Sequence, residues 1–246
     1  MLRIEESGYY QISTEQIEVG GTGEVVMILQ NDCQVKVINN EPLKLHIINR
    51  QAQEIKLSCE VSSELTVTLA ALTANDLVCS LQADLIKEQA RIKVIAAILN
   101  QSQANYDYQV NHRCKATYSQ VDNYSICLTD SQYVCLVKGV INKGCQQSQA
   151  YQTTRVLTSG SIAKIKVLPV LEMAENQIKA KHACSIGRLS TEQQYYLASF
   201  GLDKQQVTRL IAKGYLSNIL QEISDEGLRQ DLAQQIMGKV DELCLM

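Results

Sequence analysis

Residues 34–69 of this 246-residue chain read QVKVINNEPLKLHIINRQAQEIKLSCEVSSELTVTL, and within them apolar and polar residues alternate in short runs. An alternation with a period of two predicts β-strands that each bury one face. The runs lie at residues 34–38, 43–47, 54–59 and 65–69, and the pattern recurs at 77–81 and 91–95. Alternation of this kind is the dominant signal from about residue 24 to residue 188.

The spacing of these runs predicts how the strands are connected. The first four begin roughly ten residues apart, as in a β-sandwich or in a solenoid with two strands in each coil of about twenty residues. The chain has no Asn-Gly or Asp-Gly pair for hairpin turns, and its only prolines are Pro42 and Pro169. With 11 Tyr, one Phe and no Trp, the core must consist mainly of small and β-branched side chains. These features favour the solenoid, so we expect a mostly β protein built as a solenoid, with the sandwich as the alternative.

The pattern changes to a helical period at Ser190. Residues 190–193 read as a capping box that opens a helix through Phe200, with Gly201 as its terminator. A second capping box at residues 203–206 opens another helix, with Gly214 expected just past its end. A third helix is expected around residues 215–223 and a fourth after Asp225. We therefore expect a β-rich core at residues 1–189 and a C-terminal helical domain at residues 190–246.

The apolar residues of the two central helices allow two interpretations. Leu210, Ile211, Leu216 and Leu220 have the spacing of one helix face. They either pack on one another or form a groove for a partner protein.

Composition and charge exclude several classes of protein. The net charge is −3 and the pI is near 5.7, without a cluster of Lys and Arg, so nucleic acid is not an expected partner. Glu5 and Glu6 stand where a signal peptide needs an apolar run, and no membrane-length apolar segment follows. The nine cysteines lack the spacing of a disulfide framework. We expect a cytoplasmic protein with reduced thiols that is not bound to a membrane.

The sequence contains no complete active site. Residues 20–23 are rich in glycine but lack the Lys-Ser/Thr ending of a phosphate-binding loop, so they predict a plain turn. Cys-x-x-Cys motifs and nucleophile elbows are absent. Glu172 stands alone on its predicted strand, whereas glycoside hydrolysis needs two carboxylates. We therefore expect a protein that is not an enzyme.

Two His-x-Cys triplets are weak candidates for a metal or sulfur site. They are His112-Arg113-Cys114 and His182-Ala183-Cys184. On a strand, residues two apart project from the same face, so each triplet would present an imidazole beside a thiol. The alternative is that each cysteine is a small core residue and each histidine a hydrogen-bonded structural group.

From about residue 110 to residue 223 the chain resembles the SufB/SufD scaffold family of the SUF iron-sulfur cluster assembly system, and it is more similar to SufD. The resemblance rests on the order and spacing of several motifs. They are Val110-Asn111-His112 with Thr117-Tyr118-Ser119, Lys143-Gly144-Cys145 with Gln152-Thr153-Thr154-Arg155, Pro169-x-Leu171-Glu172-Met173 with Ile178-Lys179-x-x-His182 and Gly187, and Tyr195-Tyr196-Leu197-x-x-Phe200-Gly201-Leu202 with Leu210-Ile211-x-x-Gly214-Tyr215.

This resemblance implies a right-handed parallel β-helix whose last coils pair with a partner core, followed by helices that dock the SufC ATPase. His182 matches the family histidine at the interface between SufB and SufD, and we expect Cys184 and Glu172 to lie at the same interface. An iron-sulfur cluster is expected only in the complex. The implied docking residues are Tyr195, Tyr196, Phe200, Gly201, Leu210, Ile211, Gly214 and Tyr215.

The chain also departs from the family pattern. A family cysteine two residues before the interface histidine is Ala180 here, and the glycine after it is Ala183. Cys184 is expected on the same strand face as His182, where it would replace the missing thiol. The cysteine that marks SufB falls near Thr154, which favours the likeness to SufD. The N-terminal helical domain of longer members is absent from this sequence.

Two other functions remain open at this point. One is a homodimeric metal or persulfide carrier that uses the His-x-Cys faces without an ATPase. The other is a β-helix hydrolase or lyase, which needs clustered carboxylates on a solvent face. The partner of a SufD-like subunit would be either a SufB-type scaffold or a second copy of this chain.

Overall fold

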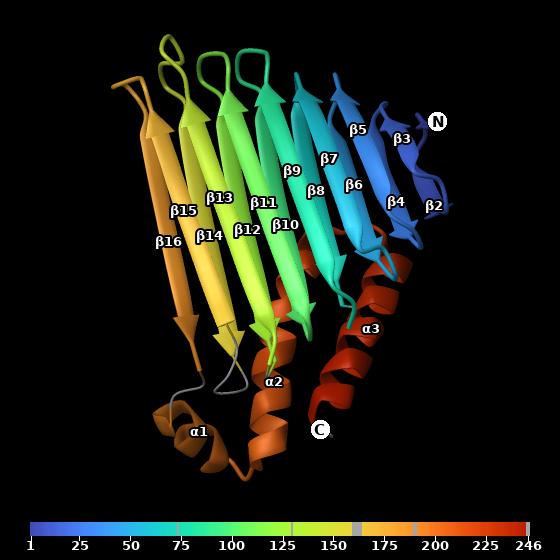
Figure 1. The fold of residues 1–246 in the computed structure, drawn as a ribbon, viewed down its shortest axis with the longest axis vertical. Helices are drawn as coiled ribbons and strands as arrows, with labels where there is room; N and C mark the ends of the chain where they lie inside the picture. The colour runs from blue at the N-terminus through green and yellow to red at the C-terminus, as the bar shows by residue number, and fades with distance from the viewer. Residues whose placement is uncertain (73, 129, 159–163, 189–190, 245–246) are drawn as a thin grey trace.

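The structure, a computed structural model, describes the chain except residues 73, 129, 159–163, 189–190 and 245–246. Two eight-stranded parallel sheets face each other, one built from the odd-numbered strands (the odd sheet) and one from the even-numbered strands (the even sheet) (Figure 1). The odd sheet contains β1 (Leu2–Ile4), β3 (Gln16–Val19), β5 (Cys33–Asn39), β7 (Glu54–Val61), β9 (Leu77–Leu85), β11 (Gln103–His112), β13 (Gln132–Ile141) and β15 (Lys164–Met173). The even sheet contains β2 (Gly8–Ile12), β4 (Gly23–Leu29), β6 (Leu43–Asn49), β8 (Glu64–Ala71), β10 (Arg91–Asn100), β12 (Tyr118–Cys127), β14 (Gln149–Thr158) and β16 (Lys179–Gly187).

Each coil contributes one strand to each sheet, as a β-helix requires, so the solenoid prediction is confirmed. The coils lengthen along the chain: Val25 pairs with Leu45, whereas Gln152 pairs with His182. The coil of about twenty residues expected from the sequence therefore holds only for the first turns. Strands also begin earlier in the chain than the alternation indicates. Three of them, β1, β2 and β3, lie before residue 24 and are too short to show a clear alternation.

The register stacks like residues above one another inside the β-helix. One interior column of the even sheet consists of Val25, Leu45, Val67, Val94 and Val121, all buried. Most cysteines fill the same interior, and burial raises the pKa of the Cys59 thiol to about 12. Such thiols behave as small apolar side chains.

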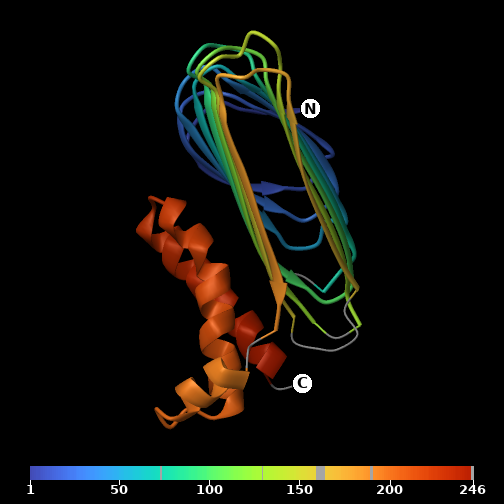
Figure 2. The ribbon, with the colours of Figure 1, turned by 90° about the vertical axis from the view of Figure 1, so that its left-hand side faces the viewer.

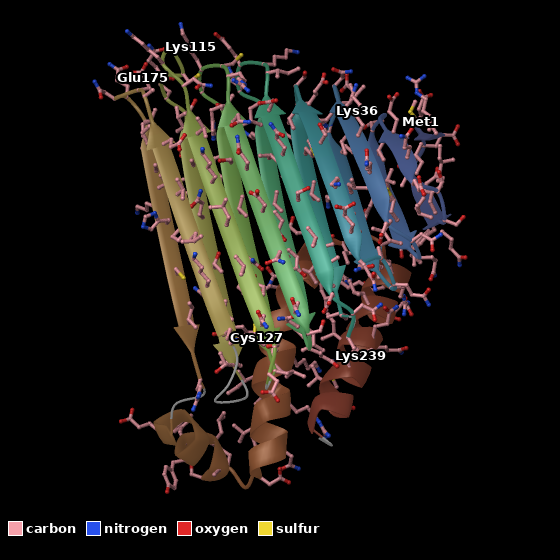
Figure 3. All side chains as sticks on the ribbon, in the orientation of Figure 1. Met1, Lys36, Lys115, Cys127, Glu175 and Lys239 are labelled. Atoms are coloured by element: carbon pink, nitrogen blue, oxygen red, sulfur yellow. The ribbon has the colours of Figure 1, made fainter. Side chains whose placement is uncertain are left out.

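Turns occupy the two ends of the strands. Figure 3 shows Lys115 and Glu175 among the turns at one end and Cys127 at the other. The glycine-rich segment at residues 20–23 is such a turn, as predicted. Gly21 has φ +79°, and a Cβ there would lie 2.1 Å from the Glu5 carbonyl oxygen, so only glycine fits.

The C-terminal helices are α1 (Thr191–Ala198), α2 (Lys204–Leu216), a 3-10 helix η1 (Ser217–Glu222) and α3 (Glu226–Cys244). The last three pack along the outer face of the even sheet, whereas α1 packs on α2 (Figure 2). The capping box of Asp203 and Gln206 is confirmed, whereas that of residues 190–193 includes Ser190 and lies outside the described residues. Gly214 lies inside α2, because the helix continues to Leu216, and the expected third helix is η1.

The helices are anchored to the body by one continuous apolar cluster. It joins Leu216, Ile219 and Leu232 of the helices to outer-face residues of the even sheet such as Ile48 and Ala97. The body is therefore the main packing partner of the apolar helix faces.

Candidate functional site

The two ends of the β-helix are built differently. At the N-terminal end Ile4 and Ile12 are buried, and Tyr10 packs against the core cluster that contains them, with its hydroxyl donating to the Glu6 carbonyl at 2.9 Å. At the C-terminal end the last coil is formed by β15 and β16, and the helices lie beside this coil rather than over it (Figure 2). Its interior residue Ile186 is 48% exposed. The last coil therefore presents its interior, and the edges of both sheets, to solvent.

Two interior columns become polar as they reach this open coil. The column of valines ending at Val121 continues with Gln152 and then His182. The neighbouring column continues from Ala96 to Asn123, Thr154 and Cys184. Gln152 and Thr154 are buried, whereas His182 and Cys184, the last members of the two columns, are exposed. The polar side chains of both columns therefore reach the surface at this end of the β-helix.

His182 and Cys184 are thus brought together as predicted, on one face of β16. With Gln152, Leu171 and Ala180, His182 lines a pocket of about 470 Å³ at the open coil. Glu172 is not part of it. Glu172 is exposed on the outer face of β15, where it pairs with Lys138 at 2.9 Å. Its role at an interface stays a prediction, separate from the His182 pocket.

The pair of His112 and Cys114 on one strand face does not form, because β11 ends at His112 and Cys114 lies in the following turn. His112 is fully buried, with Nδ1 2.7 Å from Thr117 Oγ1 and Nε2 2.9 Å from Ser119 Oγ. Burial lowers its pKa from 6.5 to about 4. His112 is therefore a neutral structural group that joins β11 to β12, as the alternative interpretation held.

Among the residues that the structure describes, no group of three or more His, Cys, Asp or Glu side chains could hold a metal ion. His182 and Cys184 are two possible donors on one face of β16.

The tail exposes four large apolar side chains on α1, the turn after it and α2, which we call the aromatic patch: Tyr195, Tyr196, Phe200 and Leu210. The rings of Tyr196 and Phe200 meet edge to face, with centroids 5.2 Å apart. Each of the four side chains is more than half exposed. Gly201 closes the turn with φ +83°, as the sequence predicted.

Two predicted docking residues, Ile211 and Tyr215, pack partly against the apolar cluster of the body instead. Of the other residues on the expected apolar helix face, Leu216 is buried and Leu220 packs partly against the same cluster. The four residues expected on one helix face therefore do not share one environment, because Leu210 is exposed to solvent and Leu216 is buried against the body.

A polar cluster that sequence reasoning missed fixes the tail to the body. Glu24 Oε1 accepts the Ser224 N–H at 3.0 Å and lies 2.9 Å from His46 Nε2, while His46 Nδ1 is 2.8 Å from Thr68 Oγ1. Burial opposes ionisation of Glu24, but the Ser224 N–H and His46 together lower its pKa. Lys44 Nζ also donates to the Glu222 carbonyl at 3.0 Å.

The sequence signal for this cluster is the spacing of about one coil between its members, which becomes visible once the register is known. Its Thr68 hydroxyl is buried, so the Thr-His-Glu arrangement offers no accessible nucleophile and acts structurally.

A match to a family profile assigns the chain to a known protein family. A family profile described as "SUF system FeS cluster assembly, SufBD core domain" matches residues 8–215. The chain belongs to the SufBD family. Its resemblance to this family in sequence motifs is thereby confirmed, and the match includes all strands after β1 and both α1 and most of α2.

Several relatives carry SufD or SufBD names. The chain is 30% identical over 136 residues to iron-sulfur cluster assembly protein SufD of Bacillus subtilis, covering 55% of this chain and 31% of that protein. It is 28% identical over 90 residues to SufD of Escherichia coli, covering 37% and 21%. It is 26% identical over 167 residues to a SufBD family protein of Synechocystis, covering 67% and 36%. The matches span less than two thirds of the length of these relatives.

The protein is therefore of the SufD type within the iron-sulfur assembly family. In the described part of the chain, no helix is both long and apolar enough to cross a membrane.

Proposed function

We propose that this SufBD-family chain is a SufD-like scaffold subunit whose open coil pairs with another β-helix and whose tail docks a SufC-type ATPase. The observation that carries the proposal is the asymmetry of the β-helix. At the N-terminal end the interior residues Ile4 and Ile12 are buried, whereas at the other end the interior groups His182 and Cys184 of the edge strand β16 are exposed. Exposed strand edges are templates for pairing with another chain.

The partner at the open coil is either a SufB-type scaffold or a second copy of this chain. Each would continue both parallel sheets and cover Ile186. His182 would then be enclosed between two chains, where it can donate a proton, ligate iron transiently or orient a sulfur species. The chemistry belongs to the assembled interface, so the chain acts as a non-catalytic scaffold.

The aromatic patch of the tail is the proposed ATPase contact. Exposed aromatic and aliphatic side chains that gather on one surface are typical of protein interfaces. The anchoring cluster around Glu24 and Lys44 holds η1 and α3 on the body, while the patch of α1 and α2 stays accessible. Movement of a bound ATPase would in this way be passed to the coils.

Leu210→Asp is expected to weaken binding of a SufC-type ATPase by about 30-fold, because burying an unpaired charge in a contact costs about 2 kcal/mol. Leu210 is 51% exposed in the free chain, so the variant should fold normally. The matched control is Ile86→Asp, since Ile86 is 45% exposed and follows the last residue of β9. Titration by isothermal calorimetry measures both.

Equal affinity of the two variants would show that the patch is not the contact. Failure of the unmodified chain to bind at micromolar concentration would refute ATPase docking itself.

We further propose that the lone chain forms no stable iron-sulfur cluster and that a cluster is assembled only in the complex. Stable clusters are generally held by four thiolate ligands, whereas the open coil offers His182 and Cys184. Anaerobic reconstitution with iron and sulfide should therefore give no persistent absorption band on the purified chain, and a band on the complex.

A stable chromophore on the lone chain would instead support the metal or persulfide carrier. Cys184→Ala tests whether its thiol contributes in the complex, with buried Cys59→Ala as the control. Unchanged assembly by Cys184→Ala would rule out a ligand role for Cys184.

A further inference from the structure

The side chain of Gln152 is buried in an unusual state. It is 5% exposed, and its Nε2 donates to the Val170 carbonyl at 3.2 Å across the interior. Its Oε1 has no hydrogen-bond partner within the described chain. A buried acceptor without a partner is destabilising, so the position calls for a donor.

The structure is built to hold this amide in place. Gly139 lies beneath it on β13, and a Cβ at Gly139 would lie 3.2 Å from Gln152 Nε2 and 3.2 Å from Leu171 Cδ2. The missing side chain of Gly139 gives the Gln152 amide room to reach β15. A glycine inside a strand often marks such a close approach. Because the Nε2 end is tied to β15, the free end of the amide is Oε1.

The neighbour that can supply the donor is His182. Gln152 and His182 are register partners on adjacent parallel strands, they belong to one interior column, and both line the 470 Å³ pocket. Among the described residues that line this pocket, Tyr151, Thr153, Lys181 and Ala183 alternate to the opposite strand face. His182 is exposed at the open coil, so its side-chain torsions are free to turn the ring towards Oε1.

We propose that Gln152 is the positioning residue of His182: its Oε1 accepts one ring N–H of the imidazole. The other ring nitrogen is then deprotonated in the neutral ring and faces the mouth of the coil, where a partner or an iron ion can meet a lone pair. Which imidazole nitrogen is available to a ligand is commonly determined by the hydrogen bond that the other nitrogen makes. Gly139 and Val170 act through Gln152 by fixing its amide.

The test uses the fact that the chain has three histidines. Nitrogen-15 spectra of the neutral rings at pH 8 report the tautomer of each one. In the unmodified chain we expect one tautomer of His182 to predominate. In Gln152→Met, which keeps the volume but removes the acceptor, the tautomer ratio should shift about fivefold, since a hydrogen bond is worth about 1 kcal/mol.

Thr154→Val is the control, because Thr154 is a buried polar neighbour in the adjacent column and should leave His182 unchanged. The signals of His46 and His112, both buried, report the integrity of the fold in every variant. If Gln152→Met disturbs the signals of His46 and His112, Gly139→Ala is used in place of Gln152→Met. The alanine side chain would displace the Gln152 amide but leave that amide in the chain.

An unchanged tautomer ratio in the acceptor-free variant, or in Gly139→Ala where it replaces that variant, would overturn the pairing of Gln152 with His182. This inference rests on the proposed function only for the use to which His182 is put. Because the spectra need neither partner nor ATPase, the pairing of Gln152 with His182 and the proposed function can fail separately. A tautomer shift in a chain that binds no partner would refute the proposed scaffold and leave the pair intact.

Discussion

Acidification from pH 7 to pH 4 is expected to lower the free energy of unfolding by about 3 kcal/mol through His112 alone. Its pKa in the folded chain is about 4, against 6.5 ordinarily, because the ring is buried. As the pH falls below 6.5, the unfolded chain binds a proton that the folded chain does not, so unfolding becomes progressively easier until about pH 4. Glu24 and His46 act in the same direction, since both have lowered pKa values.

The contribution of His112 is isolated by His112→Gln, which retains a polar side chain near Thr117 and Ser119 but cannot titrate. Urea unfolding followed by circular dichroism at several pH values should show a shallower loss of stability in this variant. His182→Gln is the control, because His182 is exposed and should leave the loss unchanged. A loss in His112→Gln as steep as that of the unmodified chain would contradict the assignment.

Ile186→Asp is expected to weaken pairing with the partner β-helix by about 100-fold, since an unpaired charge buried at an interface costs about 3 kcal/mol. Ile186 belongs to the open coil and is 48% exposed in the free chain, so the cost appears on association. Val78→Asp is the matched control, because Val78 is 47% exposed on β9, in the middle of the odd sheet.

Analytical ultracentrifugation of each variant, alone and with a SufB-type partner, measures the effect. Loss of self-association in Ile186→Asp would identify a second copy as the partner, and loss of the mixed complex would identify the scaffold. Equal pairing by Ile186→Asp and Val78→Asp would place the interface elsewhere.

The β-helix could be predicted because period-two alternation and the stacking of coils impose the same pattern on each strand. Alternation fails for β1 and β2, which are only three and five residues long. The end of α2 was misplaced because Gly214 is a usual terminator, yet packing of Leu216 on the body extends the helix beyond it.

The candidate site was predictable in part. His182 and Cys184 lie on one strand face because their spacing matches the period of the strand. The same spacing failed for His112 and Cys114, because a strand ends between them. The roles of Glu24, His46 and Gln152 depend on neighbours one coil away, and the coil length changes along the chain. Pairing between coils therefore required the register.

Hydrogen–deuterium exchange on the chain, measured alone, with a SufC-type ATPase and with a SufB-type scaffold, tests the scaffold most directly. We predict that the scaffold or a second copy protects residues 164–187, which form the open coil. The ATPase should protect residues 191–216 instead. Protection by either partner at the closed N-terminal coil, with residues 164–187 exchanging as in the free chain, would contradict the account.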